Sequence, residues 1–259
     1  MRRLVIYAHF DAQDRVRGYV RQNLQALAAL GEVHFVSNSK LSEVTLESVR
    51  SQVVATYLRE NLGFDFGMWA QVILGLDLTA YDEVLLTNSS VVGPFHALQP
   101  ILDRMESLPC DFWGLTASQM LVPHLQSYFL LFRPQVLKSD AFRRFWTSIL
   151  PYQSKDAVVF AYEIGLTQFF SDEGFTWQEA FPRGILRGSW LKNWMASRGV
   201  STGRVRRFVD PTLLYPDLLL ECGMPYVKLG LLERNPHRLN LSHLLKEVTQ
   251  LGYDPTWIL

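Results

Sequence analysis

Polar residues follow predicted buried strands at three places in the sequence, and their side chains are suited to binding a ligand. Residues 84–87 form a short apolar run that is typical of a buried strand. The trio directly after this run is Asn88, Ser89 and Ser90. A similar layout recurs around Asp111 and around His124. Because an open α/β sheet binds ligands just beyond the carboxyl ends of its strands, the three segments predict one shared site.

Strands and helices must alternate to place those segments together. The predicted strands of the first half are residues 4–8, 32–36, 53–58 and 84–87, and its predicted helices are 15–30, 41–49 and 68–76. The predicted elements of the second half are helices at 95–105, 139–150 and 158–170, and strands at 112–116 and 127–132. This order predicts an α/β fold with a mostly parallel open sheet flanked by helices. We expect a core over 1–182 and a mainly helical C-terminal extension over 183–259 that packs on it.

Composition excludes several classes of protein. The chain has 259 residues, of which 48% are hydrophobic and 19% charged, so it can bury a sizeable core and is not disordered. Its net charge of zero argues against a general nucleic-acid binder. The two cysteines, Cys110 and Cys222, form neither a disulfide framework nor a zinc motif. No segment is typical of a signal peptide or a membrane span, so we expect a cytoplasmic protein.

Basic residues are concentrated in the first part of the C-terminal extension. Residues 183–207 contain seven basic side chains and no acidic one, with Trp190 and Trp194 among them. Such a patch suits a phosphate, a nucleotide diphosphate or an anionic membrane face. It is equally compatible with a solvated helix face whose arginines pair with acids elsewhere. With the amphipathic segment 239–251, this patch favours peripheral contact with the inner face of the plasma membrane.

Six segments of the chain resemble the rhamnan synthesis protein F family, which is associated with assembly of rhamnose-containing cell-surface polysaccharides such as the O-antigen of lipopolysaccharide. They are residues 60–67, 81–95, 111–116, 124–129, 162–167 and 221–236. Their order is also similar to that of the GT-A glycosyltransferases, which implies a GT-A-like fold. The resemblance implies a nucleotide-sugar donor, dTDP-L-rhamnose first among the candidates, and a growing lipid-linked glycan as acceptor. It implies no nucleic-acid partner.

The resemblance also implies roles for the polar residues. The candidates for binding the donor are His9, Asp11, Asn38, Asn61, Gly63, Asp65, Asn88, Ser89 and Ser90. Gly63 allows close approach of the backbone to a ligand. Asp65 either holds the donor ribose or base, or caps the helix that begins near Met68, and the two roles are compatible. Arg183 and Arg187 are the candidates for binding phosphate.

Glu163 is the first candidate for a catalytic base. Glycosyl transfer with inversion needs one carboxylate to take the proton of the acceptor hydroxyl. The alternative for Glu163 is a structural carboxylate at a helix surface or in a buried ion pair. Asp111 is a second catalytic candidate, or else a turn-forming residue.

The acceptor candidates are Trp113, His124, Gln126 and Ser127. Trp113 either stacks on a sugar face or belongs to the core. His124 either contacts a ligand or is packed and satisfied by the backbone.

The metal motif of GT-A enzymes has no counterpart at the end of the fourth strand. Those enzymes hold a divalent cation through an Asp-x-Asp motif, which offsets the charge of the leaving pyrophosphate. Asn88, Ser89 and Ser90 offer no carboxylate, whereas Mg²⁺ and Mn²⁺ prefer carboxylate oxygens. We therefore expect a weak dependence on divalent metal, with the arginine-rich segment as a possible replacement.

The missing carboxylate keeps a second hypothesis open. The chain would then be a non-catalytic glycan-binding or nucleotide-sugar-binding subunit of a polysaccharide assembly complex. A Glu163 that points into the same cleft as Asn88 would argue against that hypothesis.

Overall fold

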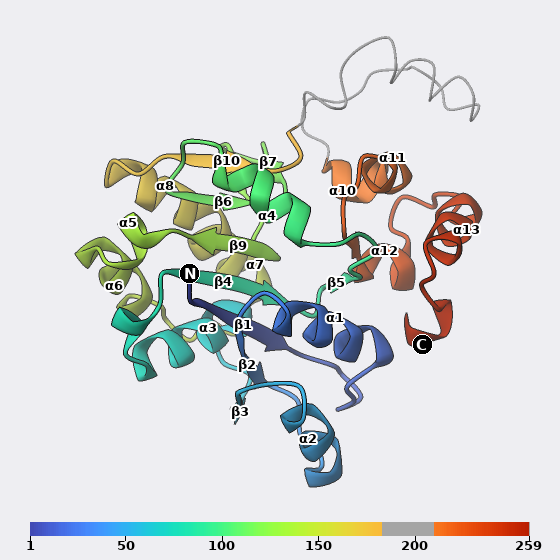
Figure 1. Ribbon diagram of the computed structural model, residues 1–259, viewed down its shortest axis with the longest axis horizontal. Helices are drawn as coiled ribbons and strands as arrows, with labels where there is room; N and C mark the ends of the chain where they lie inside the picture. Colours follow the sequence, from blue (N-terminus) through green and yellow to red (C-terminus); the bar gives the residue numbers. More distant parts are fainter. Residues whose placement is uncertain (183–209, 259) are drawn as a thin grey trace.

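The computed structural model describes residues 1–182 and 210–258, and its centre is a seven-stranded sheet (Figure 1). The sheet order is β10 (Trp177–Glu179), β6 (Phe112–Gly114), β9 (Phe129–Phe132), β4 (Glu83–Asn88), β1 (Arg3–His9), β2 (Glu32–Ser37) and β3 (Ala55–Leu58). Neighbouring strands are parallel except at β9, which runs antiparallel to both β4 and β6. The predicted α/β class with a mostly parallel sheet is therefore confirmed.

The sheet is covered on both faces, as the alternation of side chains along β1 shows. Val5 and Tyr7 belong to one hydrophobic cluster, and Leu4, Ile6 and Ala8 to the other. The helices of the first cluster are α1 (Gly18–Ala28), α2 (Glu43–Arg50) and α4 (Gln99–Glu106). Those of the second are α3 (Phe64–Gly75), α5 (Pro134–Leu137), α6 (Asp140–Thr147) and α8 (Gly165–Asp172). This three-layer arrangement leaves the strand ends accessible.

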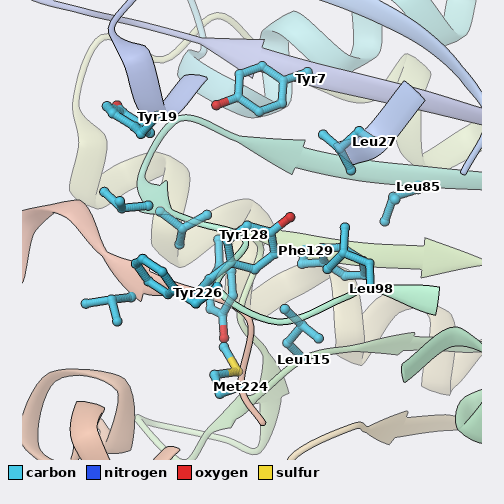
Figure 2. Packing of buried hydrophobic residues seen from close by; sticks show 14 of the residues in the cluster. Tyr7, Tyr19, Leu27, Leu85, Leu98, Leu115, Tyr128, Phe129, Met224 and Tyr226 are labelled. Carbon is cyan, nitrogen blue, oxygen red and sulfur yellow. The ribbon is translucent and has the colours of Figure 1, made fainter. Parts of the chain in front are cut away.

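The described part of the C-terminal extension joins the first cluster. Its elements are α10 (Pro211–Leu214), α11 (Pro216–Glu221), β11 (Val227–Lys228), α12 (Leu229–Arg234), α13 (Ser242–Gln250) and the 3₁₀ turn η4 (Pro255–Ile258). β11 pairs antiparallel with β5 (Val91–Val92), directly after β4. The Tyr226 hydroxyl donates to Asn23 of α1 at 2.8 Å, and Figure 2 shows Met224 and Tyr226 packed among side chains of the core. The extension therefore shares its core with the sheet.

The amphipathic segment 239–251 contains helix α13. Leu244 and Val248 on this helix are buried in the first cluster, so this apolar pair faces the protein. Within residues 1–182 and 210–258, no helix is both long and apolar enough to cross a membrane. The predicted membrane contact stays a prediction.

Element boundaries differ from the prediction mainly in the second half. The predicted helix 158–170 is instead α7 (Lys155–Val158), a π-helical turn η2 (Val159–Ile164) and α8. The predicted strand 127–132 begins only at Phe129, because the preceding residues form β8 (His124–Leu125) paired with β7 (Ala117–Ser118). The predicted helix 95–105 begins at Gln99 and has Pro100 in its first turn, a position where the missing N–H has no cost. A 3₁₀ turn, η1 (Leu78–Ala80), precedes β4.

Candidate active site

A cavity of about 660 Å³ lies at the carboxyl ends of β1, β2 and β4. The predicted residues that line it are Asp11, Asn38, Asn61, Asp65, Asn88, Ser89, Ser90, Ser127 and Glu163. They come from six separate stretches of the sequence, and strand direction explains most of the convergence, because parallel strands end at one edge of a sheet. The structure therefore brings these side chains together at one place. Of the three segments predicted to share a site, however, only the trio 88–90 lines the cavity through the residues that defined it, because neither Asp111 nor His124 lies there.

The end of β4 is fixed to its neighbours by hydrogen bonds. The Asn88 amide nitrogen donates to Asp65 Oδ2 at 2.7 Å, and its amide oxygen accepts from the backbone N–H of Ser90 at 3.0 Å. The Ser89 hydroxyl accepts from the Phe10 N–H and donates to the Phe10 carbonyl, at 3.1 and 3.2 Å. The strand end is thereby joined both to α3 and to the loop after β1.

Asp65 brings a carboxylate to this strand end from a different element. It lies in the first turn of α3, whose N-cap is Gly63 with a left-handed φ of 77°. Asp65 is therefore not the N-cap, and that part of the prediction is wrong. Burial raises the pKa of Asp65 to about 6, the nearby Glu163 charge acts in the same direction, and the Lys155 charge opposes both.

Glu163 lies on the π turn η2 and reaches into the cavity. Its Oε2 accepts a hydrogen bond from the Ser127 backbone N–H at 3.0 Å and a second from the Ser127 hydroxyl. Ser127 shortly precedes β9, the antiparallel strand, so it lies at the same edge of the sheet as the end of β4. The two bonds hold one oxygen of the carboxylate in place. Oε1 accepts no hydrogen bond from any described residue.

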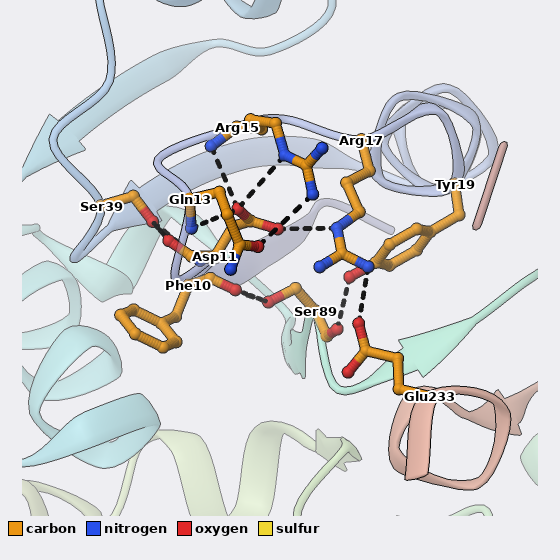
Figure 3. Close-up of polar contacts among 9 residues, drawn as sticks. All are labelled: Phe10, Asp11, Gln13, Arg15, Arg17, Tyr19, Ser39, Ser89 and Glu233. Carbon is orange, nitrogen blue, oxygen red and sulfur yellow. Dashed lines mark hydrogen bonds and ion pairs between the residues drawn. The ribbon is translucent and has the colours of Figure 1, made fainter. Parts of the chain in front are cut away.

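The opposite side of the cavity is built around Arg17, which sequence reasoning missed. Arg17 Nε donates to Asp11 Oδ2 at 2.7 Å, and a terminal nitrogen of its guanidinium donates to Glu233 of α12 at 2.6 Å (Figure 3). Burial alone would raise the pKa of Asp11, but hydrogen bonds from the Gln13 N–H and from Arg17 outweigh it and hold that pKa below its usual value. Arg17 therefore joins the loop after β1 to the C-terminal helices.

Further lining residues missed by sequence reasoning are Phe10, Tyr128, Lys155, Lys228 and Arg234. Lys228 forms an ion pair with Asp210 at 3.1 Å and lies over the Tyr128 ring. Lys228 and Arg234 belong to segment 221–236, which carries part of the family resemblance. The family resemblance of this segment could have marked both residues as candidates for the site, although it assigned no role to either of them.

Asp111 does not line the cavity. It precedes β6, which is antiparallel to β9 and therefore runs in the same direction as β4, so Asp111 lies at the opposite edge of the sheet from Asn88. Its carboxylate accepts from the N–H and the hydroxyl of Thr176, at 2.7 and 2.8 Å. The Asp111 carboxylate thus joins the start of β6 to the segment before β10 and does not form a local turn, and we do not retain it as a catalytic candidate.

Three other predicted residues are packed inside the protein. Trp113 is 1% exposed and its ring contacts Phe129. His124 is fully buried and its Nδ1 lies 2.8 Å from the Val122 carbonyl oxygen. Gln126 is tied to Thr116 and Asp210. None of the three lines the cavity.

The remaining predicted residues are His9, Gly63, Arg183 and Arg187. His9 is buried beside Ser37, at 2.9 Å between Nδ1 and the hydroxyl oxygen, and burial lowers its pKa to about 4. Gly63 acts as the N-cap of α3 and donates its N–H to the Tyr152 carbonyl at 3.1 Å. Arg183 and Arg187 lie outside the described residues.

The described residues of the cavity offer few free oxygen ligands to a divalent cation, and the expected weak dependence on metal stays a prediction. Within residues 1–182 and 210–258, no cluster of three or more His, Cys, Asp or Glu side chains could hold a metal ion. Asp11 and Glu233 both pair with Arg17, and the Asn88 amide oxygen is occupied by Ser90. Hard cations prefer several oxygen ligands with carboxylates among them.

Two curated relatives resemble the chain over much of its length. The virulence protein VirA of Vibrio anguillarum is 26% identical over 243 residues, which cover 88% of this chain and 76% of VirA. The protein y4gN of Sinorhizobium fredii is 30% identical over 149 residues, or 55% of this chain and 39% of y4gN.

Solved structures with a partly similar fold include TarS 1–349 of S. aureus and a putative nucleotide-diphospho-sugar transferase from Desulfovibrio desulfuricans. The TarS comparison has a TM-score of 0.43 and 14% identity, covering 64% of this chain and 56% of that chain. The Desulfovibrio comparison has a TM-score of 0.39 and 15% identity, covering 70% and 80%. Likenesses at this level say nothing about the substrate of this chain.

The family model of rhamnan synthesis protein F matches residues 33–255, which include most of the residues that line the cavity but not those of the loop after β1, such as Asp11 and Arg17. This match covers far more than half of the chain and agrees with the resemblance of the six sequence segments. The chain belongs to the rhamnan synthesis protein F family.

Proposed function

We propose that the protein is a glycosyltransferase that takes a sugar from a nucleotide-diphosphate donor and adds it to a growing cell-surface polysaccharide. The observation that carries this proposal is that Glu163 and Asn88 line the same cavity. A carboxylate is thereby placed at the strand ends where an α/β sheet binds ligands. Family membership supports rhamnose or a related deoxysugar as the transferred group, with dTDP-L-rhamnose as the donor.

The geometry of Glu163 suits an inverting reaction. The acceptor hydroxyl oxygen forms a bond to the anomeric carbon of the donor sugar while the bond from that carbon to the diphosphate breaks. The electron pair of the broken bond leaves with the nucleoside diphosphate. The hydroxyl proton passes to Glu163 Oε1, while Oε2 stays bonded to Ser127. Ser127 is therefore a positioning residue in this mechanism.

The donor would lie across the ends of β1, β2 and β4. Asp11, Asn38, Asp65 and Asn88 converge there and line the cavity. Carboxylate and amide oxygens accept hydrogen bonds from ribose and sugar hydroxyls, and amide nitrogens donate them. The acceptor, a lipid-linked glycan in this proposal, would then approach from the side of Glu163.

A binding subunit without catalysis is the second candidate. The observation that favours it is the trio Asn88, Ser89 and Ser90, whose polar atoms bond to neighbouring residues and include no carboxylate. Such a protein would bind a nucleotide sugar or glycan without turnover.

A screen of nucleoside diphosphates and nucleotide sugars by thermal stabilisation tests the proposal. A ligand that binds only the folded state raises the melting temperature, and we expect dTDP, UDP or their sugar conjugates to do so. Each stabilising donor is then incubated with lipid-linked glycan acceptors, and transfer is followed by release of the nucleoside diphosphate. Binding with transfer supports the enzyme, and binding without transfer to any acceptor supports the subunit. The absence of nucleotide binding at millimolar ligand contradicts the enzyme and a nucleotide-sugar-binding subunit, and it leaves only a glycan-binding subunit.

A further inference from the structure

The cavity contains four basic side chains, and they differ in how far their charge is already neutralised. They are Arg17, Lys155, Lys228 and Arg234. Arg17 pairs with two carboxylates, and Lys228 pairs with Asp210. Lys155 lies on the carboxylate side, where its charge lowers the pKa of Asp65. Arg234 makes no hydrogen bond or ion pair with any residue that the structure describes, so its charge remains available.

The Arg234 guanidinium lies against the Gly230 backbone, where the missing Cβ leaves room for it. A Cβ atom built on Gly230 would lie 2.9 Å from a terminal nitrogen of the Arg234 guanidinium and 3.7 Å from its central carbon. The guanidinium therefore lies directly over the Gly230 backbone, one helical turn away, and both residues line the cavity. Any larger residue at position 230 would displace it.

Backbone conformation gives no other reason for glycine at this position. Gly230 does not have a positive φ, unlike Gly63, Gly93 and Gly223. Glycine within a helix costs about 1 kcal/mol relative to alanine. The space above Gly230 serves to place the guanidinium.

We propose that Arg234, resting on Gly230, binds the diphosphate of the nucleotide donor. This inference depends on the proposed function and adds the residue that receives the leaving group. A guanidinium presents a planar set of N–H donors that matches two phosphate oxygens, and its charge offsets the negative charge that develops as the diphosphate departs. Asp65 and Glu163 on the opposite side would repel a diphosphate, so an unpaired cation is needed in the cavity.

Calorimetric titration of the full chain with dTDP, UDP and the two parent nucleosides tests this role. Arg234→Ala should weaken binding of the diphosphate at least ~10-fold and leave nucleoside binding unchanged, because only the phosphates contact the guanidinium. The diphosphate affinity of Arg234→Lys should lie between that of the unmodified protein and that of Arg234→Ala, since lysine keeps the charge and loses the bidentate geometry. Lys246→Ala is the matched control: Lys246 is exposed on α13 and lies outside the cavity. It should bind both ligands as the unmodified protein does.

Gly230→Ala tests the placement of the guanidinium. The added methyl group would displace a flexible side-chain end, so the fold should persist and diphosphate affinity should fall by several-fold. In an Arg234→Ala background the same change should have no further effect, because additivity fails when two residues act through one contact. An equal loss in both backgrounds would contradict the role assigned to Gly230.

The outcomes distinguish failure of the role assigned to Arg234 from failure of the proposed function on which that role depends. If the unmodified protein binds neither diphosphate, the proposed function fails and the inference fails with it. If it binds a diphosphate and Arg234→Ala binds equally well, the function stands and the inference alone is wrong. Melting temperatures of each variant, measured without ligand, show that the loss does not come from unfolding.

Discussion

Ser127 and Asp111 occupy similar places in the sequence and opposite places in the molecule. Each shortly precedes a strand, and each is followed by aromatic residues. Ser127 precedes β9 and holds Glu163 at the cavity, whereas Asp111 precedes β6 and binds Thr176 at the other edge of the sheet. The difference arises from direction, because β9 is antiparallel to both β4 and β6.

The single reversed strand therefore gives the cavity a residue that parallel strands could not supply. In a parallel sheet, only residues after a strand reach the ligand-binding edge. A residue before an antiparallel strand reaches the same edge. A polar side chain close to a strand is thus an incomplete signal for a site until the direction of that strand is known.

Loss of the base should give the largest effect. Glu163→Gln should keep the fold and the nucleotide affinity while turnover falls by roughly 10²-fold or more, because the amide cannot accept the proton. Turnover and melting temperature are measured on one preparation. Glu173→Gln, which removes a carboxylate outside the cavity, is the control. Near-normal turnover in a stable Glu163→Gln protein would leave the chain with a binding role.

Removal of the Ser127 hydroxyl should lower turnover by a smaller factor than loss of the Glu163 carboxylate. Ser127→Ala removes the hydroxyl bond to Glu163 and keeps the backbone N–H bond. We expect turnover to fall ~10-fold, which corresponds to ~1.4 kcal/mol for a hydrogen bond to a charged group. Nucleotide affinity should not change. Ser118→Ala, at a serine of β7 outside the cavity, should leave turnover intact, and a similar fall in both variants would argue against positioning by Ser127.

Removal of the Asp111 carboxylate should lower the stability of the protein and leave turnover unchanged. Asp111→Ala removes two hydrogen bonds from Thr176, so the free energy of unfolding should fall by ~1–2 kcal/mol. Urea denaturation measures that loss, and turnover per folded molecule should stay normal. Thr176→Val, which removes only the hydroxyl bond, should lose part of the same stability. Reduced turnover in folded Asp111→Ala would restore Asp111 as a candidate for the site.

Asp65 should give the smallest effect, visible as a dependence on pH. Burial raises its pKa to about 6 from 3.8, so the folded state favours the neutral carboxyl. The stability contributed by this group is complete below pH ~4 and is lost as pH rises through ~6. Asp65→Asn should therefore be more stable than the unmodified protein at pH 7, and this difference should vanish near pH 4.

Denaturation at a series of pH values measures the Asp65 effect. Asp77→Asn is a control of opposite sign, because hydrogen bonds from the Thr79 hydroxyl and N–H lower the pKa of Asp77. The stability that Asp77 contributes is present at neutral pH and lost in acid. An Asp65→Asn difference that does not vary between pH 4 and 7 would contradict the raised pKa.

The fold was predictable where apolar runs are long and separated by turn residues. The bounds of β1, β2 and β4 were predicted to within about one residue at each end, because nearly all the side chains of these strands are buried. Strand direction was not predictable for β9, since the composition of an apolar run carries no information about it. The π turn that bears Glu163 was also missed, because it continues the periodic pattern of a helix almost unchanged.

The candidate site was predictable in its polar strand ends and not in its cations. Asn88 and Asp11 follow buried strands and could be assigned to the site from that position. Arg17 and Arg234 lie in a loop and a helix, where basic residues are usually solvated, and only tertiary packing brings them together. His9 and His124 follow or form strands as well, yet both are buried and bonded within the fold.

The pairing of β11 with β5 sets the order in which a newly synthesised chain can mature. Every strand of the main sheet leaves the ribosome before β11 does, because β10 ends at Glu179 and β11 begins at Val227. Chains fold from the N-terminal side as they emerge, so the sheet can form while the cavity still lacks Lys228, Gly230 and Arg234. Synthesis thus yields the sheet first, and the residues proposed to bind a diphosphate follow only with the last tenth or so of the chain.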